Sequence, residues 1–194
     1  MFLNRVFAVT LLVLSPAALA DSLDINMNNN AAAFKYGATA DFVQGNAELQ
    51  TGLLYNDVNN MFFEAGLMVK GGGEENAPGL SIGVGAKGVF GTIPATAATN
   101  NSSINGSAIA VGGSVTLAFP TESRVAIVGE YFASPKIMSF ADAERFNQFG
   151  LRLEVGVSPQ ANVYVGYREI GFGVKTLGGV VLDKGTHMGV SILF

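Results

Sequence analysis

Apolar and polar side chains alternate along most of this chain with a period of two residues. Within residues 61–70, the odd-numbered positions are all apolar, whereas the even-numbered positions include Glu64, Gly66 and Lys70. Successive side chains of a β-strand point to opposite faces, so this pattern predicts a strand with one apolar and one polar face. The same alternation predicts further strands at residues 23–27, 34–42, 47–55, 80–90, 109–119, 124–132, 148–157, 162–168 and 187–194.

The lengths of the connections between these ten strands indicate which kind of β fold they form. Long polar or glycine-rich connections, at residues 92–106, 133–145 and 173–185, are separated by short ones at 43–46, 120–123 and 158–161. Outer-membrane barrels have an even number of antiparallel strands, short periplasmic turns and longer outer loops. The pattern therefore predicts an all-β, antiparallel transmembrane β-barrel of ten strands. The first two strands are the weakest, which leaves eight strands as the alternative, and the connections at 29–31 and 71–79 depart from the loop rule.

The N-terminus predicts export. Arg5 precedes the short apolar run of residues 6–14, and Ala18-Leu19-Ala20 matches a cleavage site, so residues 1–20 are predicted to be a cleaved signal peptide. Residues 21–194 then form one barrel domain. No later segment offers the roughly 20 consecutive apolar residues that a spanning helix needs. The 49% apolar content is distributed to every second residue, which suits strands.

Composition excludes several functional classes. The chain has no cysteine, which excludes disulfide scaffolds, thiolate zinc sites and cysteine nucleophiles. Its formal net charge of −4 argues against nucleic-acid binding. No closely spaced set of oxygen ligands predicts a metal site, and no cofactor is expected.

The polar face of the predicted strands consists of small residues and balanced charges. Charges in a narrow lumen of low dielectric are costly unless they are paired, so we expect a salt-bridge network that fills the bore. The predicted network comprises the acids Asp24, Asp41, Glu48, Glu64, Glu130 and Glu154 and the bases Lys35, Lys70, Lys87, Arg124, Arg152 and Arg168. The remaining acids, among them Asp57, Asp142, Glu144 and Asp183, are assigned to connections.

The opposite face is almost free of charge, as a surface in contact with hydrocarbon requires. Aromatic residues cluster near the strand ends, where they predict interfacial girdles. The outer girdle comprises Tyr55, Phe90, Tyr131 and Phe149, and the inner one Phe42, Phe119 and Phe194.

The last strand carries a further signal. It ends with Met188, Val190, Ile192 and Phe194 at steps of two, and so resembles the C-terminal assembly signal of bacterial outer-membrane proteins. Three further motifs are Gly-Glu-Tyr at residues 129–131 leading to Ser134-Pro135, Val-Gly-Tyr-Arg at 165–168, and the terminal Gly-Val-Ser-Ile-Leu-Phe. With these motifs the chain resembles the YfaZ family of Gram-negative outer-membrane proteins. That resemblance implies an outer-membrane β-barrel of poorly defined activity, and it supplies no catalytic residues.

Two features carry possible chemistry. Residues 83–88 match the G-x-G-x-x-G pattern of dinucleotide-binding loops, but the strand alternation continues through them and no helical pattern follows. These glycines are instead expected to relieve crowding within a strand. His187 is the only histidine, and it is expected to point into the lumen as a structural residue.

Three functional hypotheses follow from these residues. The leading one is a non-enzymatic, monomeric barrel with a packed polar lumen and a structural or loop-mediated surface role. The second is a narrow passive channel for small solutes, and the third is a barrel enzyme that uses His187. The expected partners are outer-membrane lipid and, through the C-terminal strand, the barrel-assembly machinery.

Overall fold

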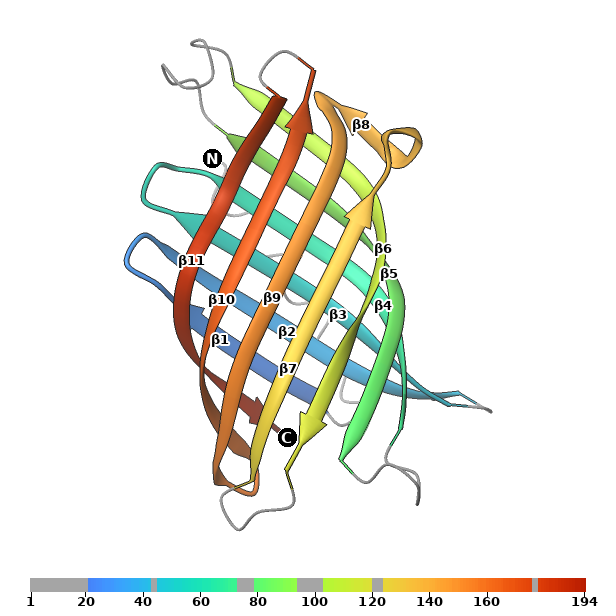
Figure 1. The fold of residues 1–194 in the computed structure, drawn as a ribbon, viewed down its shortest axis with the longest axis vertical. Coiled ribbons are helices and arrows are strands. Elements are labelled where there is room, and N and C mark those ends of the chain that lie inside the picture. Colours follow the sequence, from blue (N-terminus) through green and yellow to red (C-terminus); the bar gives the residue numbers. More distant parts are fainter. Residues whose placement is uncertain (1–20, 43–44, 73–78, 94–102, 120–123, 176–177) are drawn as a thin grey trace, which may run out of the picture.

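The structure is a computed structural model that describes residues 21–42, 45–72, 79–93, 103–119, 124–175 and 178–194. These residues form a closed antiparallel β-barrel of ten long strands (Figure 1). Each strand pairs with its neighbour around the barrel, and closure comes from pairing of the first strand with the last. The strands are β1 (Asp21–Met27), β2 (Ala31–Phe42), β3 (Gly45–Asn56), β4 (Met61–Gly72), β5 (Leu80–Ile93), β6 (Ile104–Ala118), β7 (Val125–Ser134), β9 (Ala143–Ser158), β10 (Ala161–Val174) and β11 (Gly178–Leu193).

The predicted ten-stranded barrel is confirmed, and the eight-stranded alternative is wrong. β1 pairs along its whole length with β2, from Asp21 opposite Ala38 to Met27 opposite Ala32. Asparagines and alanines weaken the alternation in these two strands, but their backbone pairing is complete. The predicted signal peptide, residues 1–20, lies outside the described residues.

One end of the barrel carries an additional element. A short strand, β8 (Ser139–Ala141), follows a 3₁₀ turn at Lys136–Met138 and pairs with the start of β6. We call this end the β8 rim, and the opposite end, where β11 finishes, the C-terminal rim (Figure 1). Because the strands are antiparallel, every second strand begins at the β8 rim and the strands between them begin at the C-terminal rim.

The strands near the β8 rim are longer than the sequence predicts. Most of the predicted connection at residues 173–185 is strand, because β10 and β11 remain paired up to Val174 opposite Gly178. A bulge between Ile170 and Gly171 shifts their register. Apolar residues such as Leu182 occupy inward positions here, so the alternation of apolar and polar residues disappears although the strand continues.

Apolar side chains cover the outward face of the barrel. The register places Tyr131 beside Phe149, and Phe63 beside Phe90, on neighbouring strands. Each of these four side chains is 43–54% exposed. Among the described residues, no helix is long and apolar enough to cross a membrane. The side chain of Phe42, assigned to the inner girdle, lies outside the described part of the chain.

Candidate functional site

The half of the lumen next to the β8 rim is filled by apolar side chains, which we call the apolar plug. Phe146 is completely buried, and its ring lies 5.9 Å from that of Phe62 and 5.2 Å from that of Phe172. Leu54 and Leu182 are also only 2% exposed. The remaining buried members of the plug are Ala31, Ala33, Val89, Ile93, Ile104, Ala108, Ala110, Phe132, Ala143, Ile170 and Val174. Met68 also belongs to the buried apolar cluster but lies past Glu64, toward the C-terminal rim. The predicted polar lumen is therefore wrong for this half of the barrel, which is filled by apolar side chains.

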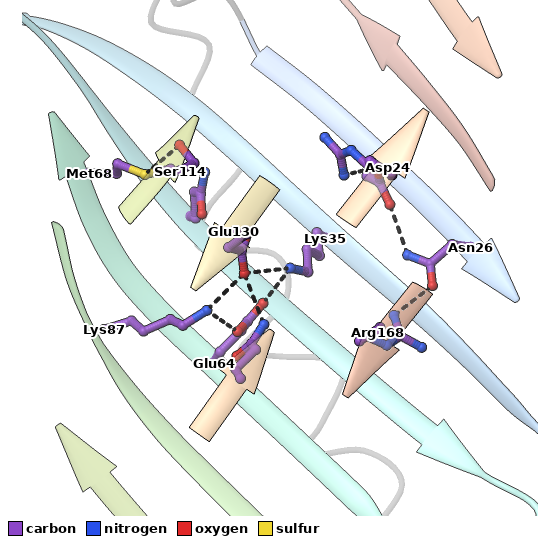
Figure 2. Close-up of polar contacts among 12 residues, drawn as sticks. Asp24, Asn26, Lys35, Glu64, Met68, Lys87, Ser114, Glu130 and Arg168 are labelled. Atoms are coloured by element: carbon purple, nitrogen blue, oxygen red, sulfur yellow. Dashed lines mark hydrogen bonds and ion pairs between the residues drawn. The ribbon is translucent and has the colours of Figure 1, made fainter. Parts of the chain in front are cut away.

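Below the plug lies a layer of charged side chains, the ionic layer, with Glu64 at its centre (Figure 2). The carboxylate of Glu64 forms ion pairs with Lys35 and Lys87, and Nζ of each lysine lies 2.9 Å from a carboxylate oxygen. Both lysines also approach Glu130, at 3.8 and 3.3 Å respectively. The ammonium group of Lys87 lies 3.9 Å from the centre of the Phe132 ring, so a cation–π contact joins the ionic layer to the plug.

A glycine makes the Lys35–Glu64 pair possible. The register places Gly52 on β3 directly between Lys35 on β2 and Glu64 on β4. A Cβ atom at residue 52 would lie 2.9 Å from Cγ of Glu64 and 3.2 Å from Cγ of Lys35. Glycine therefore leaves the space through which the two longer side chains reach each other across a strand.

A second part of the ionic layer is built around Asp24. Its carboxylate accepts hydrogen bonds from the Tyr164 hydroxyl at 2.6 Å and from the Asn26 amide at 2.9 Å. Arg152 approaches Asp24 at 3.4 Å and pairs with Glu154 at 2.5 Å. The guanidinium of Arg152 also lies 4.9 Å from the centre of the Tyr164 ring.

Arg168 and Asp183 extend this layer toward the β8 rim. Arg168 donates to Asp183 at 2.8 Å through Nε and approaches it at 2.7 Å through Nη2. It also donates to Asn26 at 2.8 Å. The assignment of Asp183 to a connection is wrong, since it is a buried residue of β11. Asp183 keeps the parity of the inward His187, so a strand prediction prolonged toward the N-terminus of β11 would have found it. The bulge between Ile170 and Gly171 places its extra residue at Leu182.

Four other charged residues of the predicted network lie outside the ionic layer. Glu48 and Lys70 form an ion pair nearer the C-terminal rim. Arg124 lies just before β7, is exposed and has a left-handed backbone with φ of 43°. The Asp41 side chain lies outside the described part of the structure. Glu144, assigned to a connection, is instead in β9.

His187 points into the lumen beside a small cavity of about 40 Å³. Its ring packs edge-on against Tyr164 at 5.8 Å. Among the described residues, Nδ1 of His187 and Oε1 of Gln148 are buried atoms without a hydrogen-bond partner, and both residues line this cavity. The cavity is large enough for water, which would satisfy both atoms. No described serine or threonine hydroxyl hydrogen-bonds to His187, so the arrangement expected of a catalytic nucleophile and base is not assembled.

A larger cavity, of about 410 Å³, lies between the ionic layer and the C-terminal rim, and we call it the rim cavity. Most of its lining residues have polar or charged side chains. Its lining consists of Ser22, Thr39, Glu48, Gln50, Met68, Lys70, Ser114, Thr116, Val128, Glu130, Arg152, Glu154, Asn162, Ser191 and Leu193. The described residues contain no group of three or more His, Asp or Glu side chains placed to hold a metal ion.

The connection before β9 projects from the β8 rim. Ile137 is 85% exposed within it, although backbone pairing of β8 with β6 anchors the segment. The Ser134 hydroxyl donates to the Met138 carbonyl at 3.1 Å. Lys136 donates to Glu144 at 2.7 Å, and this hydrogen bond lowers the pKa of the Glu144 carboxyl from its usual value.

A solved structure of the NanC porin superposes with a TM-score of 0.48 and 10% sequence identity, covering 90% of this chain and 99% of that chain. No curated protein matches the sequence. The model of one protein family, described as the YfaZ precursor, matches residues 5–194. This match covers nearly the whole sequence, and the chain therefore belongs to the YfaZ family.

Proposed function

We propose that this protein is an outer-membrane β-barrel that does not conduct solutes and acts through its structure and its outer surface. The observation that carries the proposal is the apolar plug, in which Phe62, Phe146 and Phe172 pack against one another across the lumen. An interior packed in this way leaves no continuous path for water or ions. In this proposal the β8 rim faces outward and the C-terminal rim faces the periplasm.

The outward face supports the membrane location. Leu151, Leu153 and Val165 are 44–54% exposed in the middle of their strands, a position that lipid chains would cover. Charge returns near the β8 rim, where Lys184 on β11 pairs with Glu169 on β10 at 3.1 Å. A charge-free belt that ends in an exposed ion pair is expected of a surface that passes from hydrocarbon to water.

In this proposal the ionic layer is a second barrier to ions, in addition to the plug. The side chains of Glu64 and Lys87, on the neighbouring strands β4 and β5, are only 8% and 7% exposed. Lys35 on β2 approaches Glu130 on β7, at the opposite side of the barrel, at 3.8 Å, so the layer extends across the bore. An ion crossing this layer would have to separate buried pairs, which costs several kcal/mol for each charge left unpaired. This barrier and the plug act in series, so the closed barrel is favoured over the passive channel.

The β8 rim offers the surface for a loop-mediated role. Ile137 and Phe140 are 85% and 50% exposed in a segment that strand pairing with β6 holds in place. Anchored and exposed apolar side chains suit recognition better than a freely moving loop, because less conformational entropy is lost on binding. The proposal contains no enzymatic step; within the described part of the chain, no serine or threonine hydroxyl hydrogen-bonds to His187.

Electrical recording tests the closed state. The wild-type barrel, folded in an amine-oxide detergent and inserted in planar bilayers, is expected to show no steady conductance. Replacing Phe62, Phe146 and Phe172 together by Ala removes the plug but leaves the ionic layer as a barrier. Ohmic channels are therefore expected only when Glu64 and Lys87 are also replaced by Ala. Phe149→Ala, on the outward face of the same strand as Phe146, is the matched control and is expected to remain silent. Steady ohmic conductance of the wild type would falsify the proposal.

A further inference from the structure

The rim cavity is a blind pocket with a definite chemistry. Its floor includes Glu130 and Arg152, which belong to the ionic layer, and the apolar plug lies beyond them. A molecule that enters the pocket must therefore leave by the same C-terminal rim. The volume of about 410 Å³ falls within the range of about 300–1,000 Å³ that is typical of sites for small ligands.

The charged residues of this pocket are already paired. Glu48 pairs with Lys70, and Arg152 pairs with Glu154. Glu130 is held by the lysines of the ionic layer and accepts a hydrogen bond from Gln148 at 3.0 Å. A ligand with a fixed charge would have to break one of these pairs and leave its partner uncompensated, which is unfavourable in a partly buried site.

The uncharged polar groups, in contrast, are available to a ligand. Thr39, Thr116, Asn162 and Ser191 line the pocket from four different strands. Among the described residues, none of these four side chains has a hydrogen-bond partner in another side chain. Hydroxyl and amide groups both donate and accept, so they match a ligand whose own groups do the same. The paired charged groups add hydrogen-bond donors and acceptors that are stronger than neutral ones, while the charges within each pair compensate each other.

The size of the pocket depends on a glycine in β5. A Cβ atom at Gly83 would lie 2.8 Å from the Ser114 hydroxyl and 2.9 Å from the Met68 sulfur, and both of these residues line the pocket. The absence of a side chain at Gly83 therefore leaves Ser114 and Met68 in their places and keeps the pocket open on this side. Apolar contact is supplied by Met68 and Leu193, which offer surfaces for the C–H groups of a ring.

From these observations we propose that the rim cavity binds an uncharged polyhydroxylated solute of mono- to disaccharide size, admitted from the periplasmic side. The direction of entry rests on the proposed closed barrel, whereas the binding site itself does not. A polyol satisfies the free hydroxyl and amide groups and leaves the ion pairs intact. This assigns a ligand class to a part of the lumen that the structural role does not use.

Titration calorimetry on the folded full-length barrel tests this proposal. Methyl glucoside and maltose serve as uncharged probes, glucuronate as the anionic probe and glucosamine as the cationic one. An amine-oxide detergent is required, because glycoside detergents would present sugar headgroups to the pocket. The uncharged probes are expected to bind saturably with Kd values of about 1 mM or below. Both charged probes are expected to bind at least about tenfold more weakly, because each must disturb an ion pair.

Paired variants assign the binding to the pocket. Thr39→Phe fills the cavity from β2 and is expected to abolish saturable binding, whereas Thr51→Phe on the outward face of β3 is expected to leave it unchanged. If Thr39→Phe does not fold, Thr116→Phe fills the same cavity from β6. The chain has no tryptophan, so Leu193→Trp provides a single indole at the mouth whose fluorescence should change with bound maltose.

Three results would overturn the proposal. These are the absence of saturable binding of both uncharged probes, binding of either charged probe as tight as that of methyl glucoside, and binding retained in a folded cavity-filling variant. Binding is measured in detergent, where both rims are accessible, so it is independent of conductance. A barrel that binds maltose and also conducts would refute the closed state and leave the site intact.

Discussion

Glu64 pairs with the buried Lys87 and the half-buried Lys35, so removing its charge affects two ion pairs at once. Replacing it by Gln keeps the size of the side chain but leaves Lys35 and Lys87 with only Glu130 as an acidic partner at close range. Removing one member of a buried ion pair costs about 3–5 kcal/mol. We expect Glu64→Gln to lower the free energy of unfolding by about this amount, as measured by urea unfolding in lipid vesicles.

Two further variants separate charge balance from a general effect of substitution. Glu144→Gln removes the exposed pair with Lys136 and is expected to leave the unfolding transition unchanged. Combining Glu64→Gln with Lys87→Met removes one positive charge with the negative one, and is expected to recover part of the lost stability. A double variant as unstable as the sum of its single changes would show that charge balance is not the cause.

Glycine placement shows how far single residues could be interpreted from the sequence. The strand prediction for residues 83–88 is confirmed, because β5 passes through the entire G-x-G-x-x-G match. Crowding explains Gly83 and Gly85, whose added Cβ atoms would meet neighbouring atoms at 2.8 and 2.3 Å. It does not explain Gly88, where the nearest atom is 3.8 Å away. The role of Gly52 was not predictable, since it depends on residues of two other strands.

At the scale of strands, β11 has the special position of closing the barrel. It pairs with β10 and, from Leu193 opposite Ser22 to Met188 opposite Met27, with β1. Phe194 follows the end of this strand and is 71% exposed, so it contributes little to the folded barrel itself. We propose that its side chain is recognised by the barrel-assembly machinery before the barrel closes.

We therefore expect deletion of Phe194 to slow assembly without weakening the folded product. The measurement is the rate at which a heat-modifiable band forms on electrophoresis when the assembly machinery is present in proteoliposomes. Urea unfolding of the assembled protein should be nearly unchanged. Deletion of Phe194 that leaves the assembly rate unaltered would remove the proposed signal role, and a large loss of stability would make the residue structural.

Strand boundaries were predictable only where the two faces of the barrel differ. In the middle of β9 an apolar outward face opposes Arg152 and Glu154, and the predicted strand is correct. Near the β8 rim, Phe172 and Leu182 place apolar groups inside the lumen as well, so the period of two residues is lost there. Apolar and polar residues alternate only where the two faces of a strand meet different environments, and the alternation disappears where both environments are apolar.

At the scale of the whole molecule, the lumen has a polarity gradient that composition cannot show. Strand parity predicts which charged side chains point inward, and Glu64, Lys87 and Arg168 are buried in the structure. It could not show that Phe62, Phe146 and Phe172 meet, since they belong to three strands and their contact requires the closed barrel. The depth of a residue along the barrel axis depends on strand stagger, which only the paired register defines.

That depth gives a direct test of whether a bilayer surrounds the barrel. Leu151 lies at the middle of β9 on the outward face. Asn147 lies on the same face, two residues nearer the β8 rim than Phe149. An arginine at the bilayer midplane costs about 2–4 kcal/mol, and near an interface about 0–1 kcal/mol. We expect Leu151→Arg to lower the free energy of unfolding in lipid vesicles by the larger amount and Asn147→Arg by the smaller. In a water-soluble barrel the already 48% exposed Leu151 would tolerate arginine as well as Asn147 does, so equal effects would contradict the membrane location.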